Sequence, residues 1–363
     1  MELKALENEN CVISFSDAQE MQNALDQIMA GDSWHNVYAA KCRTSMDGEG
    51  IGILNTEAET VETGLIQREP KTYPMFSVAE NTLSERSGSD ASGNKFLNFE
   101  ERLSVMNIYW AHHPEEEKCK LLVRGGHVLA MHSMQYNEIP QARLFAALRE
   151  GLNHPQFLGG TYTHERTRAD FALPKGVTQD YIDAWTRSGL PQQILAESSV
   201  RVIFLTNDIG TNTAEIIPMM MVGKCPFMIG DPIRIMHRRG RGDLLEFQKQ
   251  VDSLDVTIAK EMEEVCKLMS IRIRYPNATM LRAMKFIQLP KLAKKACQEV
   301  LENCMYASGV SAYMLYLSIN GIVDTEKGRA MSEERRFQLL SAIRRLLKFD
   351  WEAADKPGDT EIF

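Results

Sequence analysis

Pairs of apolar runs joined by short turns constrain the fold of this chain more than any other feature. The stretch KLLVRGGHVLAMHS places Gly125-Gly126 between two such runs, and glycine supplies the positive φ angles that a tight hairpin turn needs. The stretch VRVIFLTNDIGTNTAEIIPMMMV predicts a second pair of strands around a turn rich in Asn, Asp and Gly. Short turns join antiparallel strands, so the middle of the chain is predicted to form a mainly antiparallel sheet.

Helical patterns lie on both sides of these strands. Residues Ser16–Gly31 begin with an expected Ser N-cap and end in glycine. Apolar residues recur at steps of three and four from Leu244 to Met269, which predicts one long helix with Asp243 as its N-cap. The chain therefore predicts an α+β fold with a mainly antiparallel β core, flanking helices and a helical C-terminal region. We expect an acidic N-terminal α/β extension (1–74), a core domain (75–270) and a C-terminal helical region (271–363).

Charge is distributed unevenly along the chain. The chain has 41 Lys and Arg against 49 Asp and Glu, a net charge of −8. Residues 1–118 contain 9 Lys/Arg and 21 Asp/Glu, a net of −12, whereas residues 231–296 contain 14 Lys/Arg and 8 Asp/Glu, a net of +6. This balance excludes a generally basic nucleic-acid coat. A local basic face can still attract a phosphate backbone.

The densest basic segment is RIMHRRGRGD. Its cationic residues are Arg234, His237, Arg238, Arg239 and Arg241. Arginine forks onto phosphate oxygens, glycine lets the backbone approach closely, and the start of the predicted helix adds a dipole that favours anions. The segment is therefore a candidate nucleic-acid contact. The alternative is a solvated basic loop, or one that pairs with the acidic N-terminal third.

The segment TYTHERTR is a second candidate. If it forms one strand, alternation puts four side chains on one face: Tyr162, His164, Arg166 and Arg168. An aromatic ring beside two arginines suits base stacking and phosphate contact with single-stranded nucleic acid. The alternative is an exposed edge strand that its charges keep soluble. RIRY adds Arg272 and Arg274, and we expect the basic segment and this strand face to form one contiguous surface.

The local signatures of catalysis are missing from the sequence. It contains no G-x-x-x-x-G-K-[ST] phosphate loop, no G-x-S-x-G elbow and no H-E-x-x-H helix. None of the eight histidines stands at a metal-ligand spacing on a predicted element. We therefore predict no catalytic residues, no metal and no cofactor, and an enzyme is the less favoured class of protein.

The N-terminus and the cysteines bear on location. MELKALENEN is acidic and lacks the apolar stretch of a signal peptide. The seven cysteines are scattered and never spaced as C-x-x-C. The longest apolar stretch, Ile216–Val222, is far shorter than a membrane span. These features predict a cytoplasmic protein without a membrane partner.

Three segments of the chain resemble the phage/plasmid-like protein family known as domain of unknown function 932. They are NIYWAHHPEEEKCKLLVRGGHVLAMHSMQYNEIPQARLFAAL, SSVRVIFLTNDIGTNTAEIIPMM and VGKCPFMIGDPIRIMHRRG, and the similarity covers about residues 75–270. One departure is Cys225-Pro226-Phe227, where the family often has Cys-Asn-Gly. The resemblance implies a gene carried by a phage or plasmid, hence a host cytoplasm, no assigned enzymatic activity, and a family-typical position for His237.

Together these features favour a phage- or plasmid-encoded nucleic-acid-binding protein. We expect it to bind single-stranded DNA, or to anneal it, in recombination or replication. The alternative is a non-enzymatic interaction module, for phage assembly or anti-defence, that acts through its acidic surface. The opposite charges of the first third and the later segment also predict a homo-oligomer larger than a dimer, with contacts that weaken as salt rises.

Overall fold

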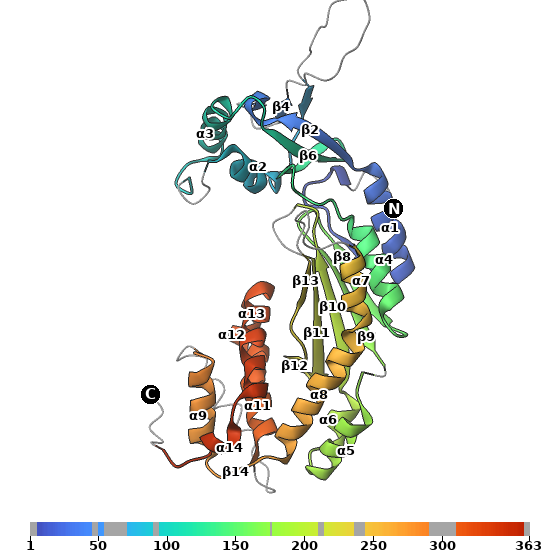
Figure 1. The fold of residues 1–363 in the computed structure, drawn as a ribbon, viewed down its shortest axis with the longest axis vertical. Helices are drawn as coiled ribbons and strands as arrows, with labels where there is room; N and C mark the ends of the chain where they lie inside the picture. The colour runs from blue at the N-terminus through green and yellow to red at the C-terminus, as the bar shows by residue number, and fades with distance from the viewer. Residues whose placement is uncertain are drawn as a thin grey trace, which may run out of the picture.

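The computed structural model describes residues 6–45, 50–53, 71–89, 94–174, 176–209, 214–235, 244–289 and 310–358. These residues form two parts, a smaller head and a larger body, which follow one another along the long axis of the molecule (Figure 1). Each part has a hydrophobic core of its own. A small third cluster, which includes Phe76 and Leu129 of the head and Ile209 of the body, lies where the two parts meet.

In its described residues, the head contains two three-stranded sheets and two α-helices. Its elements are β2 (Ser33–Tyr38), η2 (Ala39–Lys41), β3 (Cys42–Thr44), β4 (Ile51–Ile53), β5 (Lys71–Tyr73), α2 (Ala79–Ser87), α3 (Phe99–Ala111), β6 (Lys118–Arg124) and β7 (His127–Ser133). The predicted hairpin at Gly125-Gly126 is confirmed: β6 pairs with β7, and the two φ angles are 58° and 79°. β2 pairs with the other edge of β6.

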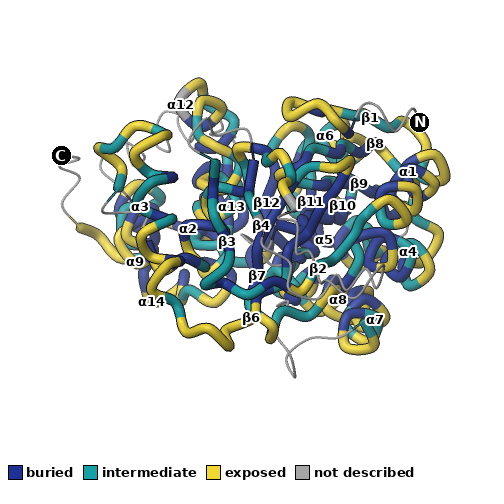
Figure 2. Tube along the Cα trace, turned by 90° about the horizontal axis from the view of Figure 1, so that it is seen from above, coloured by how far each residue is buried: buried dark blue, intermediate teal, exposed yellow. Residues whose placement is uncertain are grey.

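The body is built on a seven-stranded antiparallel sheet, in which β13 extends the edge of β11. Its strands are β1 (Ile13–Phe15), β8 (Gln156–Tyr162), β9 (Thr167–Leu173), β10 (Ser199–Thr206), β11 (Ala214–Val222), β12 (Cys225–Met228) and β13 (Ile233–Ile235). The predicted pair of strands around the Asn/Asp/Gly-rich segment is confirmed by β10 and β11. Most residues of β10, β11 and β12 are buried, and Figure 2 shows these strands largely in dark blue.

Helices cover one face of this sheet. The helices on this face are α1 (Ala18–Gly31), α4 (Gln141–Gly151), α5 (Gln179–Arg187), α6 (Gln192–Ala196), α7 (Leu244–Asp252) and α8 (Leu254–Ser270). The ring of Phe145 in α4 lies 6.0 Å from that of Phe171 and 6.3 Å from that of Phe204, and Phe247 of α7 lies 6.3 Å from Phe204. These aromatic contacts fix which side chains of β9 and β10 point toward the helices.

The opposite side chains of the sheet form what we call the α13 face, after the helix α13 (Glu333–Arg344) that lies over it. Its residues are Arg168, Asp170, Arg201, Ile203, Leu205, Glu215, Ile217, Met219 and Met221. Because side chains alternate along a strand, a charged residue such as Arg201 reaches this face while its neighbours Val200 and Val202 are buried on the other. The α13 face is thus the more polar side of the sheet.

The last part of the chain is helical, as predicted, and the α+β fold with an antiparallel core is confirmed. Its elements are β14 (Arg272–Ile273), α9 (Pro276–Phe286), β15 (Val310–Ser311), α11 (Ala312–Asn320), η3 (Gly321–Asp324), α12 (Glu326–Arg329), α13, η4 (Arg345–Lys348) and α14 (Trp351–Ala354). Within the described residues, every helix is too short or too polar to cross a membrane. The boundaries proposed at 74 and 270 stay a prediction, although β1 and α1 pack with the body.

Two helix predictions need correction. α1 begins at Ala18, and its cap is Asp17, whose carboxylate accepts the amides of Gln19 and Glu20 at 2.8 and 2.9 Å. A carboxylate satisfies these amides and also complements the helix dipole. The long apolar stripe is divided into α7 and α8 at Ser253, whose hydroxyl donates to the Gln250 carbonyl at 2.9 Å. The predicted cap Asp243 lies outside the described residues.

Candidate nucleic-acid interface

Residues 161–168 form a hairpin, so the prediction of one strand face is wrong. β8 ends at Tyr162 and β9 begins at Thr167. Between them, the amide of Thr163 donates to the carbonyl of Arg166 at 2.8 Å, and the amide of Arg166 donates back at 3.3 Å. The polar run between the two strands has no apolar side chain to place on the core, and it forms the turn instead. The four predicted side chains are therefore divided between two sites.

Tyr162 and His164 point into the interior between head and body. Their exposed fractions are 0% and 3%. The Tyr162 hydroxyl accepts a hydrogen bond from Arg124 at 2.9 Å and lies 3.3 Å from Nδ1 of His164. Nε2 of His164 lies 3.0 Å from the carbonyl of Asn8, and its ring stacks on Phe76 at 4.5 Å. Burial lowers the pKa of His164. A neutral ring with its proton on Nε2 satisfies both contacts, and neither side chain is available to a strand in this structure.

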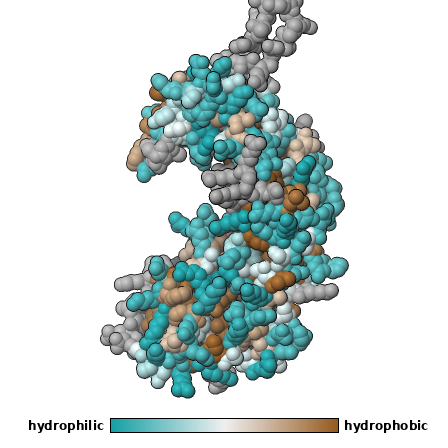
Figure 3. All heavy atoms as spheres, in the orientation of Figure 1, coloured by the Kyte–Doolittle hydropathy of each residue, from teal (hydrophilic) through white to brown (hydrophobic). Residues whose placement is uncertain are grey.

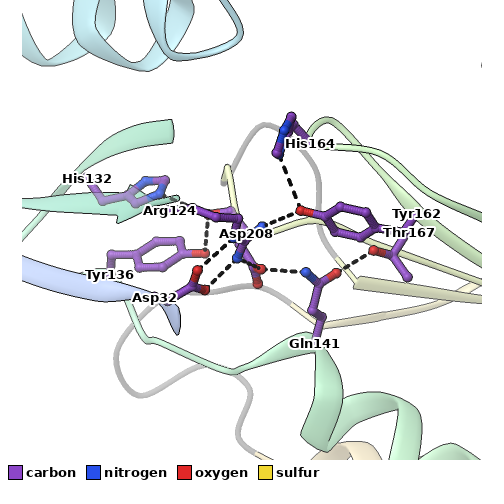
Figure 4. Close-up of polar contacts among 9 residues, drawn as sticks. All are labelled: Asp32, Arg124, His132, Tyr136, Gln141, Tyr162, His164, Thr167 and Asp208. Atoms are coloured by element: carbon purple, nitrogen blue, oxygen red, sulfur yellow. Dashed lines mark hydrogen bonds and ion pairs between the residues drawn. The ribbon is translucent and has the colours of Figure 1, made fainter. Parts of the chain in front are cut away.

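Arg124 is the centre of this buried network (Figure 4). Its Nε and Nη2 donate to the two carboxylate oxygens of Asp32 at 2.7 and 2.5 Å, and Nη2 also contacts Asp208 at 2.7 Å. Gln141 donates to Asp208 at 2.7 Å and accepts from Thr167. A fully buried guanidinium is stabilised only when its donors meet acceptors in this way.

The network joins segments that are distant in sequence. Arg124 ends β6 of the head, Asp32 follows α1, Gln141 begins α4 and Asp208 follows β10. Burial raises the pKa of Asp32, and the charge of Asp208 adds to the rise, while Arg124 opposes it. Both carboxylates border a cavity of about 390 Å³, whose wall includes Met29 from the end of α1 and Pro140 just before α4. We interpret the network as a clamp between head and body, and we call it the junction network.

Arg166 and Arg168 lie on the other side of the hairpin, on the α13 face. Nη1 of Arg166 donates to Oε2 of Glu333 at 2.7 Å, and Nη1 of Arg168 contacts Oε1 of the same carboxylate. Arg168 also donates two hydrogen bonds to Asp170, at 2.9 and 3.0 Å. Burial and the neighbouring charge of Arg168 lower the pKa of Arg166, while Glu215 and Glu334 oppose the shift. One carboxylate from α13 thus lies between two adjacent guanidinium groups.

A cavity of about 250 Å³ lies beside this pair, between the sheet and α13. Three of its basic side chains come from different elements: Arg201 from β10, Lys224 from the β11–β12 turn and Arg336 from α13. Its apolar wall is formed by Ile203, Met219, Met221, Pro226, Val323, Phe337 and Leu340. We call it the cationic cavity. In the part of the chain that the structure describes, these three basic side chains have no acidic partner, whereas Arg168, which also lines the cavity, pairs with Asp170 and Glu333.

The acidic side chains around the cationic cavity form ion pairs with arginines other than Arg201 and Arg336. Asp170 and Glu333 pair with Arg168, and Asp324 pairs with Arg329 at 2.9 Å. The described lining thus holds four basic and three acidic side chains, and Arg201, Lys224 and Arg336 are the basic ones that form no ion pair with these acids. A second cavity, of about 320 Å³, shares the Phe337 wall and is bordered by Arg166 and Arg234. On the same side, the surface is hollowed between head and body (Figure 3).

The other predicted residues do not gather at one place. Arg234 lies on β13, pairs with Glu215 at 2.9 Å and borders the second cavity. Arg272 and Arg274 are exposed on β14 and just after it, at the end of the body away from the head (Figure 1). The remaining predicted contacts lie outside the described residues: His237, Arg238, Arg239 and Arg241. The contiguous surface expected for the basic segment and the strand face cannot include Tyr162 and His164, because both are buried. For Arg166 and Arg168 it stays a prediction, because most of the basic segment lies outside the described residues.

The sequence did contain a signal for the cationic cavity. Arg201 interrupts an otherwise apolar strand, SVRVIFL, and a charge at such a position must reach a polar face of the sheet. Arg336 stands on the polar side of an amphipathic helix, where its partner surface cannot be deduced from periodicity. Only the fold brings Arg336 of α13 and Arg201 of β10 to the same cavity.

The chain matches no known family model, no curated protein and no solved structure. The likeness to the phage/plasmid-like family therefore stays a prediction from sequence, and any functional conclusion depends on the geometry of the site.

Proposed function

We propose that the protein binds single-stranded nucleic acid across the α13 face, with the cationic cavity as the centre of the interface. The observation that carries this proposal is the convergence of Arg201, Lys224 and Arg336 on one cavity without acidic partners among the described residues. An anion that binds there gains three basic contacts without breaking an ion pair that these side chains already make.

The apolar wall of the cationic cavity favours a strand over a simple anion. Phe337 borders both cavities and offers an aromatic ring close to the basic groups. Bases of a single strand can leave the stack and lie on such a ring, whereas bases in a duplex are paired inside it. Arginine forks onto phosphate oxygens while lysine adds a point charge. Phosphate contact and base stacking therefore fit one short segment of unpaired strand.

The biological setting rests on the sequence alone. The resemblance to the phage/plasmid-like family leads us to propose that a phage or plasmid encodes the protein. Strand binding or annealing during recombination or replication, in the cytoplasm of the host, is then the role we propose. The protein needs no metal or nucleotide for this role, because phosphate contact and stacking require neither.

The test is the salt dependence of binding to a fluorescently labelled strand of about 20 nucleotides, followed by anisotropy. Neutralisation of each phosphate releases counterions, so the logarithm of the binding constant falls by about 0.7 per contact for each logarithmic unit of salt. Replacing Arg201, Lys224 and Arg336 by Ala should reduce that slope by about 2, since three contacts are lost. Affinity at low salt should fall at least about tenfold.

A matched variant separates this site from a general loss of charge. Arg187, Lys249 and Lys260 lie on α5, α7 and α8, the helices on the other side of the sheet. Replacing these three by Ala removes the same charge and should leave the slope almost unchanged. Equal losses in the two triple variants would contradict the proposed interface. Absence of strand binding by the unmodified protein would favour the interaction module that acts through its acidic surface.

A further inference from the structure

We infer that Arg166 and Arg168 form a phosphate-binding subsite whose occupant in this structure is the carboxylate of Glu333. This inference rests on the proposed function, because it concerns the same α13 face. A phosphate of a bound strand would take the place of that carboxylate between the two guanidinium groups. The side chain of Glu333 would then turn into solvent.

The first argument is the geometry of the three side chains. Arg166 and Arg168 each contact a different oxygen of Glu333, so the carboxylate bridges two cations as a phosphodiester would. The two arginines belong to the β8–β9 hairpin, and Glu333 lies 167 positions after Arg166 in the chain. Glu333 is the first residue of α13, where a side chain can turn outward without unwinding the helix.

The second argument is exposure. About a third of each side chain faces solvent: 35% for Arg166, 31% for Arg168 and 29% for Glu333. Ion pairs with this exposure contribute little stability, because water and salt compensate for the lost contact. The displacement of Glu333 by a phosphate therefore costs little. The Arg124 pair with Asp32 is buried and cannot exchange in this way.

The third argument is position. Glu333 borders the cationic cavity, and Arg166 borders the second cavity on the other side of Phe337. A phosphate between Arg166 and Arg168 would thus lie beside one held by Arg201, Lys224 and Arg336. A strand that occupies the cationic cavity brings its next phosphate to Glu333, where like charge repels the carboxylate. Glu333 thereby competes with the bound strand for Arg166 and Arg168.

The test compares Glu333→Gln with Glu352→Gln, which removes the same charge from an exposed position on α14. The probes are the same labelled strand and inorganic pyrophosphate. Glu333→Gln should bind the strand about three- to tenfold more tightly, because the competing carboxylate is gone. Glu352→Gln should bind it as the unmodified protein does. Thermal unfolding of each variant confirms that it is folded.

A double variant shows whether the effect passes through Arg166. In a chain that carries Arg166→Gln, the added change Glu333→Gln should raise strand affinity by much less, because the arginine that the carboxylate covers is missing. Equal gains with and without Arg166 would overturn the inference, since they would indicate a general effect of charge. A charge effect that Glu352→Gln reproduces would overturn it too.

The two probes keep this inference separate from the proposed function. Strand binding that Glu333→Gln does not strengthen would overturn the subsite and leave the interface standing. Pyrophosphate binding gained by Glu333→Gln, in a protein that binds no strand, would support the subsite and overturn the proposed function. Failure of both probes with every variant would overturn both.

Discussion

Two groups of arginine in this molecule have similar acidic neighbours and very different surroundings. Arg124 in the junction network is 1% exposed and directs its donors to Asp32, Asp208 and Tyr162. On the α13 face, Arg166 and Arg168 keep about a third of each side chain in solvent. A buried guanidinium stabilises the fold only through fixed partners, whereas an exposed one can exchange its partner for a ligand. Burial therefore separates a structural arginine from one that can bind.

The largest effect should come from Arg124→Met. This change leaves Asp32 and Asp208 buried without their cation, so the free energy of unfolding should fall by about 3–5 kcal/mol. Urea unfolding measures the loss. Adding Asp32→Asn and Asp208→Asn should restore part of it, because the unpaired carboxylates are removed. An Arg124→Met protein as stable as the unmodified one would show that the junction network is not a clamp.

A smaller loss is expected from the hairpin next to Arg124. Gly125 has a φ of 58°, and a Cβ there would lie 3.2 Å from the carbonyl oxygen of Leu6. Gly126 has a φ of 79°, and a Cβ there would stay more than 4 Å from every other described residue except its chain neighbours. Gly126→Ala should cost about 1 kcal/mol from backbone strain alone, and Gly125→Ala should cost more. Equal thermal shifts for the two variants would show that the contact with Leu6 is not tight.

The third effect depends on pH. Burial lowers the pKa of His164, so the unfolded chain takes up its proton first as the pH falls. Stability from this residue is present above its unfolded pKa of about 6.5 and declines as the pH falls from there toward the lowered folded value. Urea midpoints at about pH 5.5 and about pH 7.5 should therefore differ less in His164→Gln than in the unmodified protein. An unchanged difference would mean that other groups cause the pH dependence.

The smallest effect on stability should come from the α13 face. Arg166→Gln breaks an ion pair with Glu333 that is partly exposed, so the free energy of unfolding should change by less than about 1 kcal/mol. Thermal unfolding of this variant beside Arg124→Met tests the comparison directly. A loss as large as that of Arg124→Met would remove the distinction between the two groups of arginine.

The sequence predicts the elements of this fold better than their ends. Gly125-Gly126 marks a hairpin because glycine alone adopts both φ angles readily, and β10 and β11 follow from their apolar runs. The break at Ser253 was missed because the apolar phase continues across it: Val251 and Leu254 are both buried. Periodicity reports which face is apolar, and it does not report a local loss of helical hydrogen bonds.

The candidate site was harder to predict, because its partners are distant in sequence. Tyr162 is buried by Arg124, 38 residues earlier in the chain, and Arg166 meets a glutamate 167 residues later. An arginine looks the same in a sequence whether it closes a buried network or borders a cavity. Only Arg201, alone in an apolar strand, indicated a polar face.

The head leaves and re-enters the body at neighbouring points. Met29 at the end of α1 and Pro140 before α4 border the same cavity, and the whole head lies between them in the chain. An insertion with adjacent ends can be exchanged without rerouting the host fold. Replacing residues 33–138 by a short glycine-rich turn would leave every strand of the body sheet in the chain. Because Arg124 is lost with the head, Asp32 and Asp208 would then have to be changed to Asn. The head is in this sense a replaceable module, and the junction network is the ion-pair contact that connects it to the body.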